Sequence, residues 1–213
     1  MANWNEVIVN LGAKVGPQAL TDGTLANGRA DRTGALVVQQ GHGKYFEAAI
    51  RGRLFYSHCA ARAMSAPATS AIGNIVWNPP GSGMYLVFGP WDVTYLVDDA
   101  DARAVDFCYS VQAALPGSVT AADASGPCLV GAVGSSSGVA KCYAIATVTT
   151  AATPIRTLIE IGTAKLSLGT VVAGGDLDGS IIIPPGYLAS LHTIAAAGTA
   201  GVSSTLVWEE IPI

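Results

Sequence analysis

The sequence predicts an all-β protein, a sandwich or barrel of antiparallel strands that follows an extended arm. From residue 53 to the C-terminus, short runs rich in β-branched and aromatic residues succeed one another. Segments rich in glycine, proline, serine and aspartate separate these runs and are typical of turns. Helical periodicity is confined to one short segment, so there is no alternation of strands and helices that would indicate a parallel sheet.

Residues 1–34 are predicted to form an extended arm rather than part of the domain. They contain one apolar run, at residues 7–9, followed by a passage rich in glycine, asparagine, aspartate and threonine that has little to bury. We expect a neighbouring subunit to order this arm, with the apolar run and a few charges at the contact. The residues expected there are Val7, Ile8, Val9, Arg29, Asp31 and Arg32.

Residues 35–213 are expected to form a single β-sandwich domain, because a chain of 21.6 kDa can bury a sizeable core. A strand-like run, ALVVQQ, begins it. One short helix is predicted near residues 44–51, where Phe46 and Ile50 lie one turn apart on one face. Gly52 is expected to end this helix.

The strand-like runs begin at Arg53. They read RLFYSHCA, NIVW, MYLVF, DVTYLV, VDFCYSVQAAL, PCLVGAV, AKCYAIATV, IRTLIEIGT, SIII, YLASLHTIA and SSTLVWEEI. YLASLHTIA has apolar residues on both of its faces, which predicts a strand covered on both sides. Such a strand fits a subunit interface, to which Leu191 and Ile194 would contribute, or the middle of a sheet.

Two long uncharged stretches, residues 63–91 and 179–208, are apolar enough to suggest membrane spans, but Pro-Pro-Gly interrupts each of them. We therefore expect no membrane segment. Pro79-Pro80-Gly81 and Pro184-Pro185-Gly186 are expected to form corners at equivalent edges of two sheets. Both stretches should be buried in the sandwich or between subunits, and the charges should gather on the arm, the helix and the Asp-rich turns.

Composition favours an assembled structural protein over an enzyme. Only 12% of the residues are charged and 50% are hydrophobic, whereas a soluble domain carries about a quarter charged residues. Much of the surface must then be uncharged or face other subunits. The net charge of -4 and the absence of a basic patch argue against a nucleic-acid partner. The N-terminus shows no secretory signal, so we expect a protein folded in a cytoplasm.

Two acidic turns are candidates for binding a cation, since calcium takes several carboxylate and carbonyl ligands from one flexible loop. The residues are Asp98, Asp99 and Asp101 in one turn and Asp176 and Asp178 in the other. Solvated aspartates that accept local backbone hydrogen bonds are the alternative that we favour. The three histidines form no cluster in the sequence, so no metal or cofactor is expected.

No motif predicts catalysis. Gly134-Ser135-Ser136-Ser137-Gly138 matches the pattern of a nucleophile elbow, but a strand rather than a helix follows it, which favours a hairpin loop. Glu209 and Glu210 should point to opposite faces of one strand, which prevents joint acid–base work. The four cysteines are expected to be reduced core residues, with Cys128 and Cys142 the pair best placed for a disulfide. The tryptophans are expected to pack in the core or an interface.

Three blocks of the sequence resemble a group of tailed-phage virion proteins. They read GALVVQQGHGKYFEAAIRGRLFYSHCA, NIVWNPPGSGMYLVF and IIIPPGYLASLHTIAAAGTAGVSSTLVWEEIPI. The resemblance covers most of the chain but not residues 98–179. It implies a β-sandwich of jelly-roll type that enters the particle as a homo-oligomer, as capsid decoration (cement) proteins do, commonly as trimers. The family offers no catalytic motif to carry over.

The predicted function is that of a non-enzymatic virion structural protein, a capsid decoration protein that binds the phage head and bridges capsomers. Its expected partners are further copies of itself, as a homotrimer, and the major capsid protein, with neither nucleic acid nor membrane. It would be assembled into the virion in the host cytoplasm. A receptor- or glycan-binding module of a tail fibre or tail tip is the alternative. The position of the protein on the particle would distinguish a decoration protein from a tail module.

Overall fold

The computed structural model describes residues 43–95, 103–129, 138–161, 171–194 and 201–213, and its compact β-rich unit begins at Tyr45. Several residues that the sequence singles out lie outside the described ranges. They are the predicted arm contacts Val7, Ile8, Val9, Arg29, Asp31 and Arg32 and the acidic turn of Asp98, Asp99 and Asp101.

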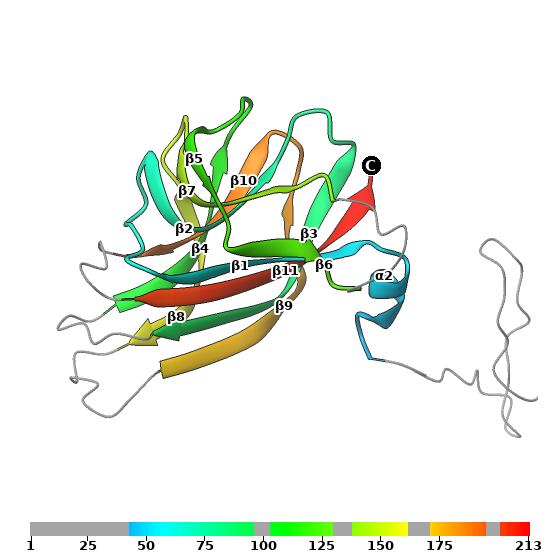
Figure 1. Cartoon of the computed structure of the whole chain (residues 1–213), viewed down its shortest axis with the longest axis horizontal. Helices are drawn as coiled ribbons and strands as arrows, with labels where there is room; N and C mark the ends of the chain where they lie inside the picture. The colour runs from blue at the N-terminus through cyan, green and yellow to red at the C-terminus, as the bar shows by residue number, and fades with distance from the viewer. Residues whose placement is uncertain (1–42, 96–102, 130–137, 162–170, 195–200) are drawn as a thin grey trace, which may run out of the picture. The chain divides into compact units, whose positions relative to one another are not determined.

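The described residues form one short helix, α2 (Phe46–Ile50), and antiparallel strands (Figure 1). The strands are β1 (Leu54–Arg62), β2 (Ser70–Asn78), β3 (Met84–Tyr95), β4 (Arg103–Val111), β5 (Gly117–Ala121), β6 (Ala124–Pro127), β7 (Lys141–Thr147), β8 (Thr153–Ile161), β9 (Val171–Ile183), β10 (Tyr187–Thr193) and β11 (Val202–Pro212). The α2 helix is too short to span a membrane, and the described residues contain no other helix.

Helix α2 lies within the predicted range and ends where glycine allows it to. Gly52 has φ +66°, a conformation that side chains other than glycine rarely adopt. The Gly52 N–H donates to the carbonyl of Ala49 and the Arg53 N–H to that of Ala48, both at 2.9 Å. This pair of bonds satisfies two carbonyls at the end of the helix and turns the chain into β1.

Two antiparallel sheets pack face to face, which confirms the predicted all-β sandwich. The five-stranded sheet has the order β6-β1-β11-β3-β9 and the six-stranded sheet the order β5-β7-β2-β10-β4-β8. The pairing is nested: β1 pairs with β11, β2 with β10, β3 with β9 and β4 with β8. Pairing the first of eight strands with the last, and so on inward, is the topology of a jelly roll.

The remaining strands are an insertion between β4 and β8. Strand β6 extends the five-stranded sheet beside β1, while β7 and β5 extend the six-stranded sheet beside β2. Both sheets are therefore widened on the same side of the jelly roll, next to β1 and β2. This insertion falls in residues 98–179, which the resemblance to virion proteins does not cover.

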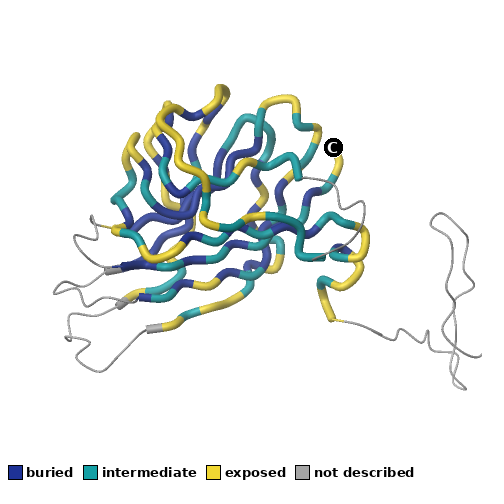
Figure 2. Tube along the Cα trace, in the orientation of Figure 1, coloured by how far each residue is buried: buried dark blue, intermediate teal, exposed yellow. Residues whose placement is uncertain are grey.

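The core lies between the two sheets, and Figure 2 shows its buried residues along the facing strands. Phe88 from one sheet meets Phe107 from the other in an edge-to-face contact, with ring centroids 5.0 Å apart. Phe55 stacks on Trp208 at 6.3 Å. Leu191 belongs to this core and is fully buried, so the prediction that it contacts another subunit is corrected: the opposite sheet covers it. Ile194 is exposed.

Strand β10 is covered on both sides because it is central, which is the second of the two predicted explanations. It lies between β2 and β4, and on its outer side Leu188 joins a second apolar cluster with Ile75 and Trp77 of β2. Two connecting segments, residues 112–116 and 148–152, contact this outer side. Trp77 Nε1 donates to the Gln112 carbonyl at 2.9 Å, and Val148 belongs to the same apolar cluster.

The two Pro-Pro-Gly corners were predicted to mark the edges of two sheets, and this prediction is wrong. They carry the chain from one sheet to the other. The first links β2 to β3 and the second links β9 to β10. Gly81 has φ +76° and Gly186 φ +82°, as such sharp turns require. The Gly186 N–H donates to the Asn78 carbonyl at 2.8 Å, so the two corners lie side by side.

The expected distribution of charge is right in part. Strands β2 and β10, from the two uncharged stretches, are almost entirely buried. Charges also lie on strands, however, and Asp106 of β4 and Glu210 of β11 are buried. The prediction that the charges gather on the arm, the helix and the turns is therefore corrected, because these two carboxylates have hydrogen-bond donors inside the fold.

Candidate functional site

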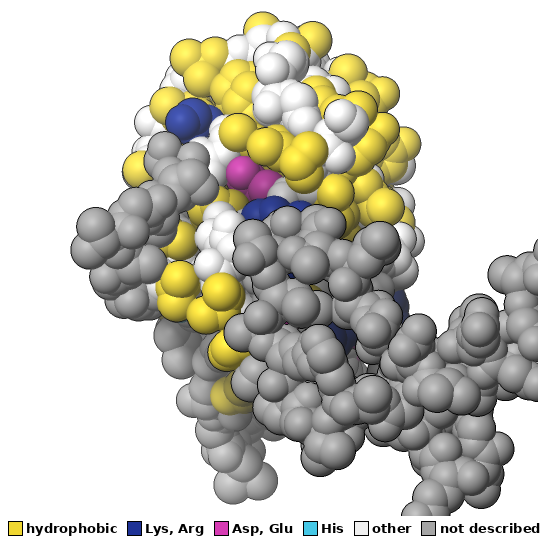
Figure 3. All heavy atoms as spheres, turned by 90° about the vertical axis from the view of Figure 1, so that its right-hand side faces the viewer, with side chains coloured by type: hydrophobic (Ala, Val, Ile, Leu, Met, Phe, Trp, Pro, Cys, Tyr) yellow, Lys and Arg dark blue, Asp and Glu magenta, His cyan; other side chains and the backbone are white. Residues whose placement is uncertain are grey.

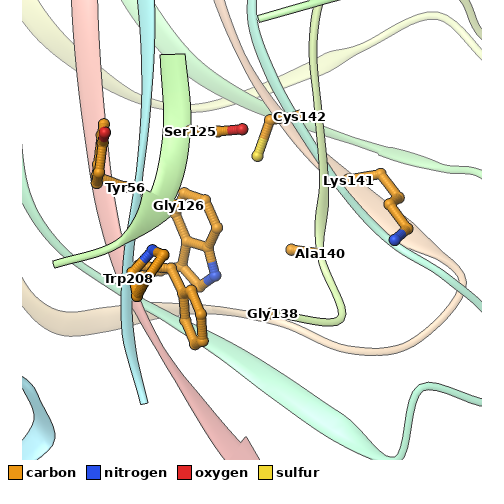
Figure 4. Close-up of a pocket in the computed structure, with 10 residues that line it drawn as sticks. Tyr56, Ser125, Gly126, Gly138, Ala140, Lys141, Cys142 and Trp208 are labelled. Carbon is orange, nitrogen blue, oxygen red and sulfur yellow. The ribbon is translucent and has the colours of Figure 1, made fainter. Parts of the chain in front are cut away.

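A cavity of about 450 Å³ lies where the inserted strands widen the sandwich (Figure 4). One wall comes from β1, β6 and β11 of the five-stranded sheet, and the other from residues 138–142 at the start of β7. The lining residues are Phe55, Tyr56, Ser125, Gly126, Pro127, Gly138, Ala140, Lys141, Cys142 and Trp208. The lining is mixed, with aromatic rings, the hydroxyl groups of Tyr56 and Ser125, one thiol and one ammonium group.

The tryptophans do not form an exposed stacking platform in the described residues. Trp77, Trp91 and Trp208 are all buried, as the favoured prediction held, and Trp4 lies outside the described ranges. Trp208 contacts the cavity, yet its ring is held between Phe55 and Phe88 in the core. Of the aromatic residues that line the cavity, Tyr56 is the one that is not fully buried.

Glu210 fixes the backbone at the entrance to β7. One of its carboxylate oxygens accepts the Val139 N–H at 2.9 Å and the other the Ala140 N–H at 3.1 Å, while the side chain is buried. Glu209 points the other way and pairs with Arg53 at 3.3 Å. The prediction that these two acids face opposite sides of a strand is confirmed, and Glu210 is a carboxylate that positions backbone.

Cys142 is the residue of the cavity with the most reactive chemistry, and its environment suppresses that chemistry. Its sulfur and the Ser125 hydroxyl point toward each other in Figure 4. Burial raises the pKa of the Cys142 thiol to about 11, although hydrogen bonds from Ser57 and Ser125 act in the opposite direction. Because the thiolate is the nucleophile, a thiol with this pKa is unreactive near neutral pH.

The other cysteines are free thiols as well, and two of them share this suppressed chemistry. Burial raises the pKa of Cys59 to about 11 and that of Cys108 to about 12, with the nearby carboxylates Asp123 and Asp106 adding to the rise. Burial also raises the pKa of Cys128, the suggested disulfide partner of Cys142. These thiols are packing residues.

A buried histidine, serine and aspartate lie close together on the outer side of β10 and β4. His192 Nε2 lies 2.9 Å from the Ser190 hydroxyl, and its Nδ1 lies 3.2 Å from the Ser65 carbonyl. Asp106 faces His192 across the strand pair and accepts the Thr157 hydroxyl at 2.7 Å. These residue types also form hydrolytic triads, but His192 and Ser190 have no exposed surface and cannot meet a substrate.

Asp176 and Asp178, the candidates for a cation, lie in β9 where its pairing with β3 shifts register, and the Asp176 carboxylate accepts hydrogen bonds from within the protein. The Asp176 carboxylate accepts the Tyr45 hydroxyl at 2.6 and 2.7 Å and the Asp178 N–H at 2.8 Å. Within the described ranges, no three potential metal ligands come together. Asp176 thus holds the residue before helix α2 against β9.

A second surface is notable for its lack of charge. We call it the strap face: residues 112–121, with β5, and residues 147–155, which lead from β7 into β8. Gln112, Pro116, Val148 and Ala152 are buried and anchor it, while the side chains between them are exposed. The Thr149 N–H donates to the Gln112 side chain at 2.8 Å and so joins the two segments. The strap face contains no charged residue.

The sequence alone did not predict the role of Glu210 or the strap face, and the reason is the same for both. The carboxylate of Glu210 meets residues 139 and 140, and Gln112 meets residue 149, only after strands distant in the sequence have paired. The signals in the sequence for the strap face are two uncharged runs, residues 107–122 and residues 142–155.

Comparisons with models of protein families, with curated proteins and with solved structures find no match to this chain.

Proposed function

We propose that this chain is a non-enzymatic structural protein of a bacteriophage virion, a capsid decoration protein that binds the head and bridges capsomers as a homo-oligomer. The observation that carries the proposal is the strap face, an exposed and uncharged surface on a rigid jelly roll. Charged residues are depleted at the centres of protein–protein interfaces. A surface of this kind suits a protein whose work is to be held between other proteins.

The environment of the reactive side chains also supports a structural role. The Cys142 thiol in the cavity is held protonated, and the His192 cluster is closed to solvent. Glu210 is occupied by backbone N–H groups. Glu210 thus positions backbone, and the Cys142 thiol and the His192 imidazole are held in environments that do not favour catalysis.

The free energy that binds the protein to its neighbours would come from apolar surface buried at their interfaces. Each Å² of apolar area removed from water contributes about 25 cal/mol, and association costs of several kcal/mol are subtracted from the sum. Interfaces of several thousand Å² are typical of permanent complexes. The jelly roll would supply the rigid body between neighbours, and the N-terminal segment of residues 1–34 would attach it to the shell.

The position of the protein on intact particles tests the proposal. Gold-labelled antibody against the purified chain should decorate phage heads in electron micrographs, and label confined to the tail would overturn the assignment. A variant lacking residues 2–30 should keep the circular dichroism spectrum and thermal transition of the full chain but fail to bind isolated heads. Full head binding by this variant would contradict the role given to the arm.

The cavity favours a second candidate, a glycan-binding module of a tail fibre or tail tip. Tyr56, which is partly exposed, lines the cavity with the Ser125 hydroxyl and the Lys141 ammonium group. Aromatic faces beside polar groups are suited to sugars, and lectins are among the proteins with jelly-roll domains. Label at the tail, together with loss of host adsorption in a Tyr56→Ala variant, would favour this candidate.

A further inference from the structure

We propose that the apolar run Leu36-Val37-Val38 docks on an apolar patch on the outer face of the five-stranded sheet, beside its edge strand β9. The run belongs to ALVVQQ, which the sequence predicts to begin the domain and which lies outside the described ranges. The occupant is a segment of the same chain, so this inference goes beyond the proposed function and does not depend on it. The register of three strands, the position of Tyr45 and the length of the connection support it.

The apolar patch is continuous because its residues face the same way on adjacent strands. Tyr85 and Val87 alternate with core residues of β3, so they point to the outer face of the sheet. Val87 pairs with Ile182 of β9, and Tyr85 pairs with Ile211 of β11. Ile213 is 69% exposed, Ile182 52% and Tyr85 38%. We call these residues the outer patch: Tyr85, Val87, Ile182, Ile211 and Ile213.

The outer patch is the kind of surface that another segment covers. Figure 3 views the side on which the C-terminus lies in Figure 1, and hydrophobic side chains gather on the described surface there. Glu209, which pairs with Val87, is already engaged by Arg53 at 3.3 Å. Contiguous apolar residues with polar groups at their border are typical of a contact site.

The described chain begins beside the outer patch. The Tyr45 hydroxyl donates to the Asp176 carboxylate of β9 at 2.6 and 2.7 Å. The same hydroxyl lies over β3, since a Cβ atom added to Gly89 would be 2.7 Å from it. Gly89 is two residues from Val87, which is about 7 Å along a strand. Tyr45 is therefore a fixed point at the border of the outer patch.

The short connection to Tyr45 keeps the apolar run near this surface. Val38 precedes Tyr45 by seven residues, which span at most about 25 Å when fully extended. A segment tethered this closely has an effective concentration in the millimolar range, so it outcompetes a free partner for the same surface. The residues between them, from Gln39 to Lys44, are polar or glycine. The apolar run is thus the part of the connection that gains most from leaving water.

The other end of β9 offers the run no comparable surface. Val172 is exposed and lies within similar reach of Asp176, but it pairs with Thr94, and Gly174 pairs with Asp92. An apolar segment that leaves Tyr45 therefore meets apolar side chains toward Ile182 and polar ones toward Val172. This difference makes Val172 the matched control for Ile182.

Disulfide trapping in the full chain tests the proposal. Cysteine replaces Leu36, Val37 or Val38 in turn, together with Ile182→Cys, and the oxidised products are separated on non-reducing gels and mapped by mass spectrometry. We expect at least one pair to form a disulfide within the monomer, roughly tenfold faster than the same position paired with Val172→Cys. The native cysteines are present in every variant, and the single variants measure their background reaction.

Hydrogen exchange gives a second measurement without introduced cysteines. Ile182→Asp should speed amide exchange at residues 36–38 by roughly tenfold, because apolar side chains lose their contact and meet a carboxylate. Val172→Asp should leave this exchange unchanged. Thermal unfolding reports whether both variants are folded. If Ile182→Asp fails to fold, Tyr85→Ser takes its place with the same expected result.

Several results would overturn the proposal. They are equal rates of disulfide formation with Ile182→Cys and Val172→Cys, no disulfide from any of the three positions, and exchange at residues 36–38 that Ile182→Asp leaves unchanged. Disulfide-linked dimers in place of cross-linked monomers would overturn it too, since the run would then dock on a second copy. None of these measurements involves phage heads, so the proposed function stands or falls separately.

Discussion

Ser57 and Asn74 join the two sheets in the middle of the sandwich: the Ser57 hydroxyl donates to Asn74 Oδ1 at 2.7 Å, and both residues are fully buried. Asn74 Nδ2 donates in turn to the carbonyls of Ser57 and Ser204, at 3.0 and 3.2 Å. A buried amide is stable only when its donors and acceptor are paired. The pairing therefore fixes how β2 sits against β1 and β11.

Replacement of Asn74 by alanine should destabilise the fold by about 3 kcal/mol, because it removes the acceptor of the Ser57 hydroxyl and the side-chain donor to two carbonyls in the core. Denaturant unfolding measures the change. Ser70→Ala, at the exposed start of the same strand, is the control and should alter stability by less than about 0.5 kcal/mol. Equal effects of the two substitutions would show that the amide pairing does not hold the sheets.

The neighbours Glu209 and Glu210 should respond very differently to removal of their carboxylates. Glu210→Ala leaves the N–H groups of Val139 and Ala140 unpaired, and we expect a loss of about 2–3 kcal/mol with faster hydrogen exchange at both amides. Glu209→Ala removes a partly exposed ion pair with Arg53 and should cost less than about 1 kcal/mol. Unchanged exchange at residues 139 and 140 in the Glu210 variant would contradict this assignment.

Stability should decline with acidification because of His192. Burial lowers the pKa of His192 in the folded state, against smaller opposing effects of the Ser65 and Ala66 backbone and of Asp106. The native state then binds fewer protons than the unfolded chain. Stability present above the ordinary pKa of about 6.5 is lost as pH falls toward the lower folded value, with a slope of at most about 1.4 kcal/mol per pH unit.

The difference between the wild type and His192→Asn isolates this contribution. Free energies of unfolding are measured for both proteins between pH 8 and pH 5, and the wild-type curve should fall more steeply below about pH 6.5. Carboxylates that titrate at lower pH are present in both proteins and cancel in the difference. Parallel curves over the whole interval would mean that His192 takes up its proton as easily in the folded protein as in the unfolded chain.

The thiols should be nearly inert in the native protein. With a pKa of about 11, Cys59 and Cys142 are ionised in roughly one molecule in a thousand at pH 8, so a disulfide reagent should modify them slowly. All four cysteines should react at once in denaturant, because they are free. Cys142→Ser shows which part of any native reaction belongs to the cavity. Rapid native labelling that this variant abolishes would reveal an activated thiol.

The strands were predictable because each leaves a local pattern of β-branched and aromatic residues between turn formers. Helix α2 and its end at Gly52 were predictable for the same kind of reason. The corners at Pro80 and Pro185 were located correctly, but their role was not, since a turn between sheets and a turn at an edge use the same residues. The interface role of Leu191 failed because alternation does not say what covers a face.

Composition, periodicity and turn chemistry are properties of neighbouring residues, and they were enough to establish a low-charge β protein without any coordinates. The tertiary structure was needed to show that the strands form a jelly roll. It also showed that buried Glu210 and Asn74 hydrogen-bond distant segments, and that two uncharged segments come together as the strap face. The physical reason is that burial and hydrogen bonds join residues far apart in the sequence, as Asn74 and Ser204 are at 130 positions, and their meeting depends on the register of the whole sandwich.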